Sequence, residues 1–191
     1  GKVTEAKQEV VYEYAPKVGG NVEVKYVIAG TETNLKDPVT LVTNGQVGSD
    51  YTATKENTIT KDGLVYELVT TNNGLKEGSA AETGKVTEAK QEVVYEYAPK
   101  VGGNVEVKYV IAGTETNLKD PVTLVTDGQV GSDYTATKEN TLTKDGLVYE
   151  LVKTNNGLKA GSATETGKVT EAKQEVVYEY APKVGGNVEV K

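Results

Sequence analysis

The chain repeats itself with a period of 83 residues, and this period constrains the fold more than any other feature of the sequence. Residues 1–83 and 84–166 align without a gap, and residues 167–191 reproduce 1–25. A solenoid unit of about 20–45 residues shares its core with its neighbours, whereas a unit of this length can hold a core of its own. The period therefore predicts two tandem small domains. The two full copies differ at five positions: Asn44/Asp127, Ile59/Leu142, Thr70/Lys153, Glu77/Ala160 and Ala81/Thr164.

Within one copy, apolar and polar residues alternate in the way that predicts short β-strands with one buried face. The fold class expected is therefore mostly β, with about five short strands in each unit. Turns are expected at Asn44–Gly45 and Lys61–Gly63, a loop over 70–85, and one helical turn over 86–91. The expected strands are 21–28 (Val22, Val24, Tyr26 and Ile28 inward), 37–43 with Pro38 at its start, 49–60 interrupted near 55–57, 64–69 (Leu64, Tyr66 and Leu68 inward) and 92–97 (Val93, Tyr95 and Tyr97 inward).

The segment VVYEYAPKVGGNVEVK occurs three times, at 10–25, 93–108 and 176–191, and has two interpretations. Gly19–Gly20 between two alternating runs is a hairpin signal. Against a hairpin, Pro16 cannot donate to a strand ladder, which favours a connector over Ala15–Gly20 with the glycine pair as a hinge. The connector interpretation predicts repeat domains with their linkers at 21–103 and 104–186. Residues 1–20 then close a preceding repeat and include its linker, and 187–191 begin a further one.

The composition excludes most catalytic chemistry. Cys, His, Met, Trp, Phe and Arg are absent, so there is no thiol nucleophile, no imidazole base and no ordinary zinc or copper site. The net charge of −7 disfavours nucleic acid and anionic membrane as partners. No apolar stretch has the length of a membrane span or a signal-peptide core. We expect no enzyme activity, no catalytic residue and no cofactor.

Three groups of side chains were weighed as candidate sites. Tyr26, Tyr51 and Tyr66 are expected as core aromatics and not as a platform for sugars, while Tyr12 and Tyr14 share a face that suits a seam between repeats. Asp37, Asp50, Glu56 and Asp62 are scattered and do not match a calcium loop, so no metal site is predicted. A Lys–Asn isopeptide bond needs a buried carboxylate beside the pair, which ordinary composition does not indicate.

Four motifs follow one another in each copy: Val22, Val24 and Tyr26; Gly45, Gly48 and Tyr51; Gly63, Tyr66 and Leu68; and Val93, Tyr95 and Tyr97. Their order resembles the mucin-binding-protein (MucBP) repeats of Gram-positive surface proteins. One departure is that two residues separate Gly63 from Tyr66, where the family has adjacent glycine and tyrosine. The near identity of neighbouring copies is similar to the Streptococcal High Identity Repeats in Tandem (SHIRT) of cell-wall-anchored adhesins.

The resemblance implies MucBP or β-grasp-like domains arranged end to end as an elongated, monomeric rod on the outside of a Gram-positive cell. Such a rod is a stalk that projects an N-terminal ligand-binding region from the cell wall, with a length set by the number of repeats. Its partners are the neighbouring repeats and, through the parent adhesin, a host glycoprotein. The alternative is a module that binds mucin or host glycans through avidity. A third interpretation is homophilic contact through exposed strand edges.

Overall fold

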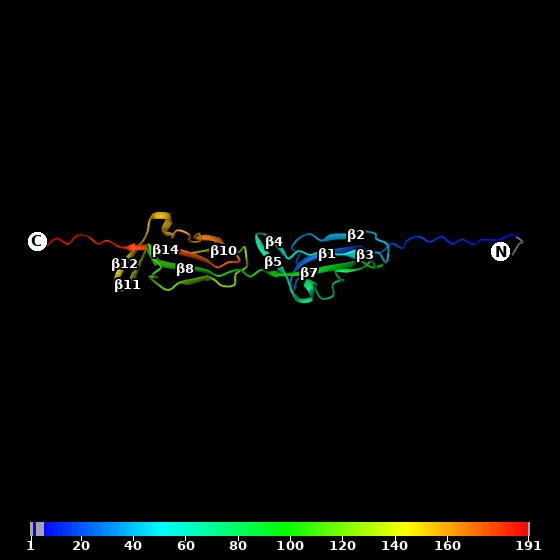
Figure 1. Ribbon diagram of the computed structural model, residues 1–191, viewed down its shortest axis with the longest axis horizontal. Helices are drawn as coiled ribbons and strands as arrows, with labels where there is room; N and C mark the ends of the chain where they lie inside the picture. The colour runs from blue at the N-terminus through cyan, green and yellow to red at the C-terminus, as the bar shows by residue number, and fades with distance from the viewer. Residues whose placement is uncertain (1, 3–5, 191) are drawn as a thin grey trace. The chain divides into compact units, whose positions relative to one another are not determined.

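The computed structural model describes residues 2 and 6–190, and it consists almost entirely of strands and loops. Each repeat has seven strands and one short 3-10 segment (Figure 1). The expectation of two tandem mostly-β domains is confirmed, although five strands per repeat was too few. In the first repeat the elements are β1 (Val22–Ile28), β2 (Val39–Val42), β3 (Asp50–Thr52), β4 (Thr58–Lys61), β5 (Leu64–Leu68), η1 (Thr71–Gly74), β6 (Thr83–Lys85) and β7 (Gln91–Pro99).

The second repeat has the same elements in the same order. They are β8 (Val105–Ile111), β9 (Val122–Val125), β10 (Asp133–Thr135), β11 (Thr141–Lys144), β12 (Leu147–Leu151), η2 (Thr154–Gly157), β13 (Thr166–Lys168) and β14 (Gln174–Pro182). Five strands form one sheet, in the order β2-β1-β7-β5-β4 in the first repeat and β9-β8-β14-β12-β11 in the second. The other two strands of each repeat, β3 with β6 and β10 with β13, form a separate antiparallel pair.

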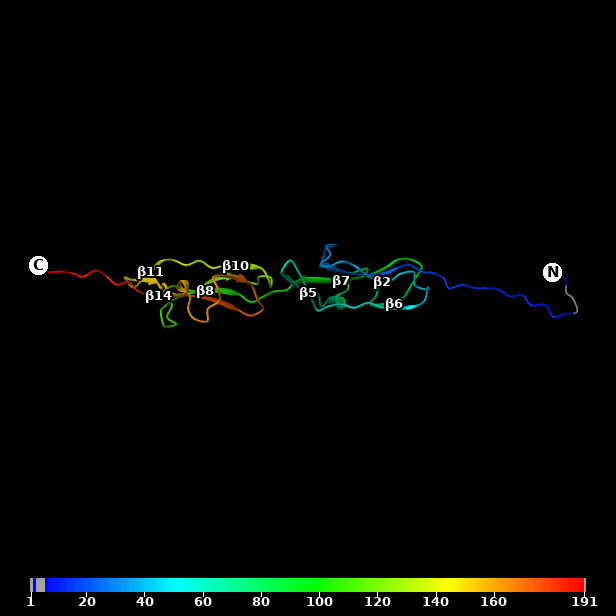
Figure 2. The ribbon, with the colours of Figure 1, turned by 90° about the horizontal axis from the view of Figure 1, so that it is seen from above.

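The first and last strands of each repeat are parallel neighbours. All seven residues of β1 pair in register with β7, from Val22 opposite Gln91 to Ile28 opposite Tyr97. Strands β8 and β14 pair in the same way, and Figure 2 shows them side by side. Because the two strands run in one direction, the chain enters a repeat at one end of this pair and leaves it at the other.

The core lies on the face of the sheet that the alternation predicts. Val22, Val24 and Tyr26 of β1 are buried, and so are the residues expected inward on β7. Val93, Tyr95 and Tyr97 are each fully buried. One detail of the expectation was wrong: Val27 is fully buried, whereas Ile28 is half-buried.

The turn at Asp62–Gly63 is confirmed, since both residues have positive φ and join β4 to β5 as an antiparallel hairpin. Asn44 also has positive φ, but β2 pairs with β1 and not with the residues after the bend. A Cβ on the neighbouring Gly45 would lie 2.5 Å from the Val42 side chain, so that close packing there requires the glycine.

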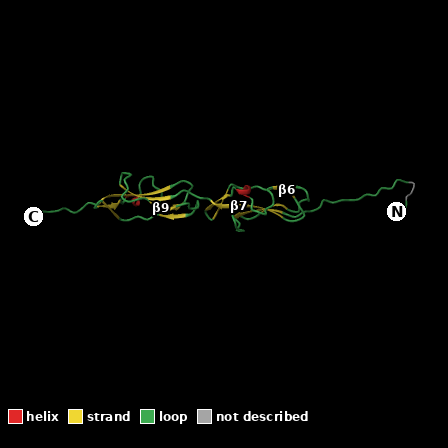
Figure 3. Ribbon diagram, turned by 90° about the horizontal axis from the view of Figure 1, so that it is seen from below, coloured by secondary structure: helices red, strands yellow, loops and turns green. Residues whose placement is uncertain are grey.

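Two local expectations were wrong. The region 70–85 contains η1, in which Asn72 and Asn73 have left-handed backbone angles, and it contains β6. A three-residue strand with a central glycine has no alternating pattern. Gly84 is needed there because a Cβ would lie 2.8 Å from the Tyr51 hydroxyl oxygen. Residues 86–91 do not form a helical turn: residues 88–89 bend, and Gln91 already begins β7. Figure 3 colours almost all of each repeat as strand or loop.

The segment expected as a connector divides into two parts with different roles. Ala98 and Pro99 end strand β7. Gly102 and Gly103 pack against the repeat that follows them: Gly102 N–H donates to the Gly128 oxygen at 2.8 Å, and Gly103 N–H to the Thr170 oxygen at 2.9 Å. Gly19 and Gly20 make the same bonds to Gly45 and Thr87. The glycine pair is therefore packed and not a hinge, and residues 10–25 do not form a hairpin.

Two identical segments have different structures. Residues 92–99 form most of β7, whereas the same sequence at 9–16 forms no strand. Tyr95 is fully buried, but its counterpart Tyr12 is 75% exposed. The strand therefore depends on contacts with the rest of its repeat and not on its own sequence.

The packed glycine leads to a prediction with a control inside the same chain. A Cβ on Gly103 would lie 2.4 Å from the backbone of Ala172, whereas nothing lies within 4 Å of its counterpart Gly186. We expect Gly103→Ala to lower the free energy of unfolding of the second repeat by about 2 kcal/mol, because backbone must move. Gly186→Ala should have no effect. Urea denaturation of both variants measures the difference, and equal stabilities would contradict the packing.

Candidate functional site

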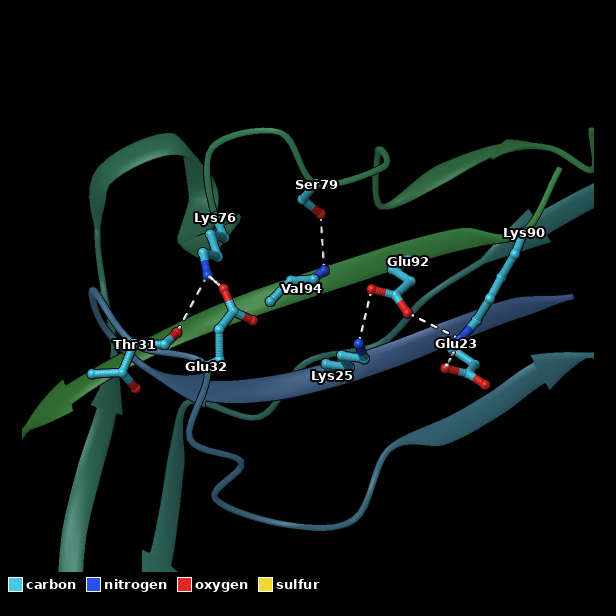
Figure 4. A network of polar contacts seen from close by, with 9 residues as sticks. All are labelled: Glu23, Lys25, Thr31, Glu32, Lys76, Ser79, Lys90, Glu92 and Val94. Atoms are coloured by element: carbon cyan, nitrogen blue, oxygen red, sulfur yellow. Dashed lines mark hydrogen bonds and ion pairs between the residues drawn. The ribbon is translucent and has the colours of Figure 1, made fainter.

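The solvent-facing side of the paired first and last strands carries a network of charges (Figure 4). Glu23 of β1 lies opposite Glu92 of β7 in the register, so two like charges face each other. Two lysines compensate them: Lys90 Nζ lies 2.7 Å from Glu23 and 3.0 Å from Glu92, and Lys25 Nζ lies 2.8 Å from Glu92. The network therefore links the two strands through side chains as well as through the backbone.

The hydrogen bonds in this network shift the acid–base equilibria of its members. The bonds from Lys25 and then Lys90 hold the pKa of Glu92 below its usual range. The bonds to Glu23 and Glu92 raise the pKa of Lys90. In the second repeat Lys108, Lys173, Glu106 and Glu175 repeat the arrangement with the same shifts for Glu175 and Lys173. The alternating charges are visible in the sequence. Which lysine pairs with which glutamate depends on the parallel register of the two strands, which the sequence does not give.

The loop after η1 lies along the other edge of β7. Val94 donates its N–H to Ser79 Oγ at 2.8 Å, and its carbonyl oxygen accepts from Lys76 N–H at 2.9 Å. The Lys76 side chain pairs with Glu32 and donates to the Thr31 oxygen. The last strand is thus held on both edges, by β1 on one side and by this loop and β5 on the other.

Two of the three tyrosines expected in the core are buried there. Tyr26 and Tyr51 are buried, and Tyr26 stacks on Tyr95 with ring centroids 6.0 Å apart. Tyr66 is half-buried. Tyr12 and Tyr14, which suggested a seam, are exposed. A platform for sugars needs exposed ring faces, and the buried rings do not provide one.

The hydroxyls of three buried rings donate to loop carbonyls. Tyr26 donates to the Thr54 oxygen at 3.0 Å, Tyr51 to Ala81 at 3.1 Å and Tyr97 to Glu56 at 2.9 Å. Burial raises the pKa of Tyr97 to about 12. Burial also raises the pKa of Tyr95.

The residue types of an isopeptide bond meet at one place in each repeat. Lys55 Nζ and Asn73 Nδ2 lie 3.0 and 2.9 Å from the same oxygen of Glu82. Lys55 Nζ donates to the backbone oxygen of Asn73 at 3.2 Å, and Asn73 is exposed. The Glu82 side chain is 28% exposed, so it is not the buried carboxylate that such a bond needs, and the cluster is an ion pair with an amide hydrogen bond.

The four acidic residues weighed as metal ligands remain apart. Asp50 pairs with Lys85 at 2.6 Å, Glu56 pairs with Lys36, and Asp62 lies in the β4–β5 turn. Within residues 2 and 6–190, no three His, Cys, Asp or Glu side chains are grouped so that they could hold a metal ion. None of the helical segments in this part of the chain has the length and apolar character that crossing a membrane requires.

A pocket with a volume of about 420 Å³ lies in the second repeat beside η2. Its polar lining includes Asn140, Glu150, Lys153 and Asn156. Lys153 corresponds to Thr70, one of the five positions that differ between the copies, so the two repeats would present different linings there. The pocket contains no tyrosine.

Comparison with known proteins identifies the family. The MucBP domain model matches residues 21–98 and again residues 104–181. The chain belongs to the MucBP-domain family. The family expected from the sequence is thereby confirmed, and the chain consists of MucBP repeats in tandem.

Two individual proteins are similar to these MucBP repeats. The muramidase-released protein of Streptococcus suis is 37% identical over 125 residues, which are 63% of this chain and 9% of that protein. A solved pair of SHIRT domains, domains 3–4 from a cell surface protein, shares 11% identity at a TM-score of 0.34. That match covers 87% of this chain and 99% of the solved one. The chain thus spans a small part of the curated relative.

The lowered pKa of Glu92 and Glu175 predicts acid sensitivity. A carboxyl whose pKa is depressed by folding stabilises the protein above its unfolded pKa of about 4.3, and this stabilisation is lost as the pH falls through the folded pKa. Because both groups are partly exposed, we expect a loss of only about 0.5 kcal/mol in each repeat. Urea denaturation between pH 7 and pH 3 measures it. The double variant Glu92→Gln and Glu175→Gln should show a smaller fall with pH than the parent chain, and an identical fall would contradict the assignment.

The raised pKa of Tyr97 and Tyr180, about 12 in both, predicts a second change at high pH. A phenol whose pKa is raised by folding stabilises the protein fully below its unfolded pKa of about 10. That stabilisation is lost as the pH rises from about 10 towards the folded value. Tyrosinate absorbance and circular dichroism, recorded together, should show these phenols ionising only as the repeats unfold. Ionisation of all tyrosines in the folded state near pH 10 would contradict their burial.

Proposed function

We propose that these MucBP repeats are the stalk of a bacterial cell-surface adhesin and act as a spacer. They would project an N-terminal ligand-binding region away from the cell wall, with a reach set by the number of repeats. The observation that carries the proposal is the parallel pairing of the first and last strands. It places entry and exit at opposite ends of a repeat, about 25–30 Å apart along the nine residues of β7. Each added copy then adds length.

Several features support a spacer over a module with its own ligand. The aromatic rings of both repeats are mostly in the core, and the pocket beside η2 has a lining that changes between copies. Near-identical tandem domains also risk exchanging strands during folding, so their retention suits a role in which more copies are useful. We propose no enzyme activity. The partners proposed are neighbouring repeats and, through the parent adhesin, a host glycoprotein.

The location proposed is the outer surface of a Gram-positive cell, with the parent protein anchored in the cell wall. The family match and the similarity to a streptococcal protein support it. The alternative function is a module that binds mucin or host glycans. The name of the family favours that alternative. A binding module of this kind requires that the affinity for mucin or glycans increase with the number of repeats.

Small-angle scattering of one-, two- and three-repeat proteins tests the stalk. We expect the maximum dimension to rise linearly, by at least about 25–30 Å with each repeat. A maximum dimension that does not change on adding a repeat would reject the stalk. A mucin pull-down with the same proteins tests the alternative, and saturable binding by a single repeat would show that the repeats are more than spacers.

A further inference from the structure

We propose that each repeat is a load-bearing element in which the parallel strand pair, β1 with β7 or β8 with β14, forms a mechanical clamp loaded in shear. The inference rests on the proposed stalk, because a tethered stalk carries tension between the surface and whatever its tip holds. It adds that the fold resists this tension through one identifiable set of interactions.

The direction of the strands decides how tension acts on the pair. Tension reaches β1 at its first residue, Val22, and leaves β7 at its last, Pro99. These points lie at opposite ends of a parallel pair, so the strands are pulled past each other along their length. The ladder bonds are then loaded together. If the strands were pulled from the same end, the bonds would be loaded and broken one after another.

Further backbone bonds extend the ladder beyond the seven paired residues. Gln91 N–H donates to the Asn21 oxygen at 2.9 Å at one end, and Ala29 N–H to the Tyr97 oxygen at 2.8 Å at the other. Gln174 and Ala112 make the corresponding bonds in the second repeat. Buried valine and tyrosine side chains cover one face of the pair, so water has little access to the bonds from that side.

Side-chain contacts also join the two strands of the clamp. The ion pairs of Lys25 and Lys90 with Glu92 and Glu23 join β1 to β7 and its preceding residue. The docked glycine pair holds the strand entry, and β5, with the loop after η1, holds β7 from its far edge. Each of these contacts opposes sliding of one strand against the other.

The absence of cysteine from the sequence makes the test direct, because any cysteine introduced becomes a unique attachment point. The full chain is pulled by its two ends in a single-molecule force experiment. We expect two unfolding steps, each releasing about 250 Å of chain for the residues between the start of the first strand and the end of the last. The comparison is the same chain pulled through Val101→Cys and Ala172→Cys. These exposed positions flank one end of the β8–β14 pair, so the strands are peeled apart.

At the same force, we expect end-to-end pulling to unfold the second repeat at least about tenfold more slowly than peeling, since several ladder bonds must then break together. Equal rates in the two directions would overturn the clamp. The stalk is judged separately by scattering. If the maximum dimension grows linearly with repeat number but the unfolding rates are equal in the two pulling directions, the clamp alone is rejected. If unfolding is slower end to end but the maximum dimension does not grow, the stalk alone is rejected.

A matched pair of variants locates the resistance. Glu92→Gln with Glu175→Gln removes one charge from the clamp of each repeat, and Asp50→Asn with Asp133→Asn removes one charge from the ion pairs to Lys85 and Lys168 across the separate two-stranded sheets. We expect the first pair to speed unfolding under end-to-end tension about twofold, the effect of a partly exposed ion pair. The second pair should leave the rate unchanged, because those sheets are not loaded until the clamp opens. Equal effects of the two pairs would contradict the location.

Discussion

The parallel pairing of the first and last strands is the interaction on which each repeat depends. It joins residues that are far apart in the sequence, such as Val22 and Gln91, and closing so long a loop has an entropic cost that the contacts must offset. The rest of the repeat is arranged around this pair. Strand β2 covers the free edge of β1, while β5 and the loop after η1 cover that of β7. The same pairing separates the points where the chain enters and leaves, which makes the repeat suitable for extending a chain.

The residue types available explain how the two faces of this pair are stabilised. With Phe and Trp absent, tyrosine supplies the aromatic volume of the core, and several of its hydroxyls reach loop carbonyls at Thr54, Glu56 and Ala81. The core and the loops are thereby joined by hydrogen bonds. On the solvent face, the facing pair Glu23 and Glu92 would repel, and Lys25 and Lys90 offset that repulsion. Strand pairing and charge placement therefore depend on each other.

Much of the fold could be predicted from local pattern, and the failures have identifiable causes. The alternation in β1 and β7 indicated the buried face, and Asp62–Gly63 indicated its hairpin. Strand β6 was missed because Gly84 gives no pattern: its role is to let the Tyr51 ring approach. The glycine pair was interpreted as a hinge because glycine marks flexibility as well as close packing, and the sequence alone does not distinguish the two. The charged residues of the clamp could be identified in the sequence, but the ion pairs that they form could not.

The repeat period, the alternating faces, the chemistry excluded by composition and the family can all be derived from the residues themselves. Which strands pair with each other cannot be derived in this way. The segment at 92–99 is a buried strand and its identical copy at 9–16 is not, so the local sequence specifies which side chains turn inward but not whether a strand forms. A strand takes its hydrogen bonds and much of its burial from residues distant in the chain. Tertiary structure therefore decided the parallel register, the docking of the glycine pair and, with them, the opposite placement of the two ends of a repeat.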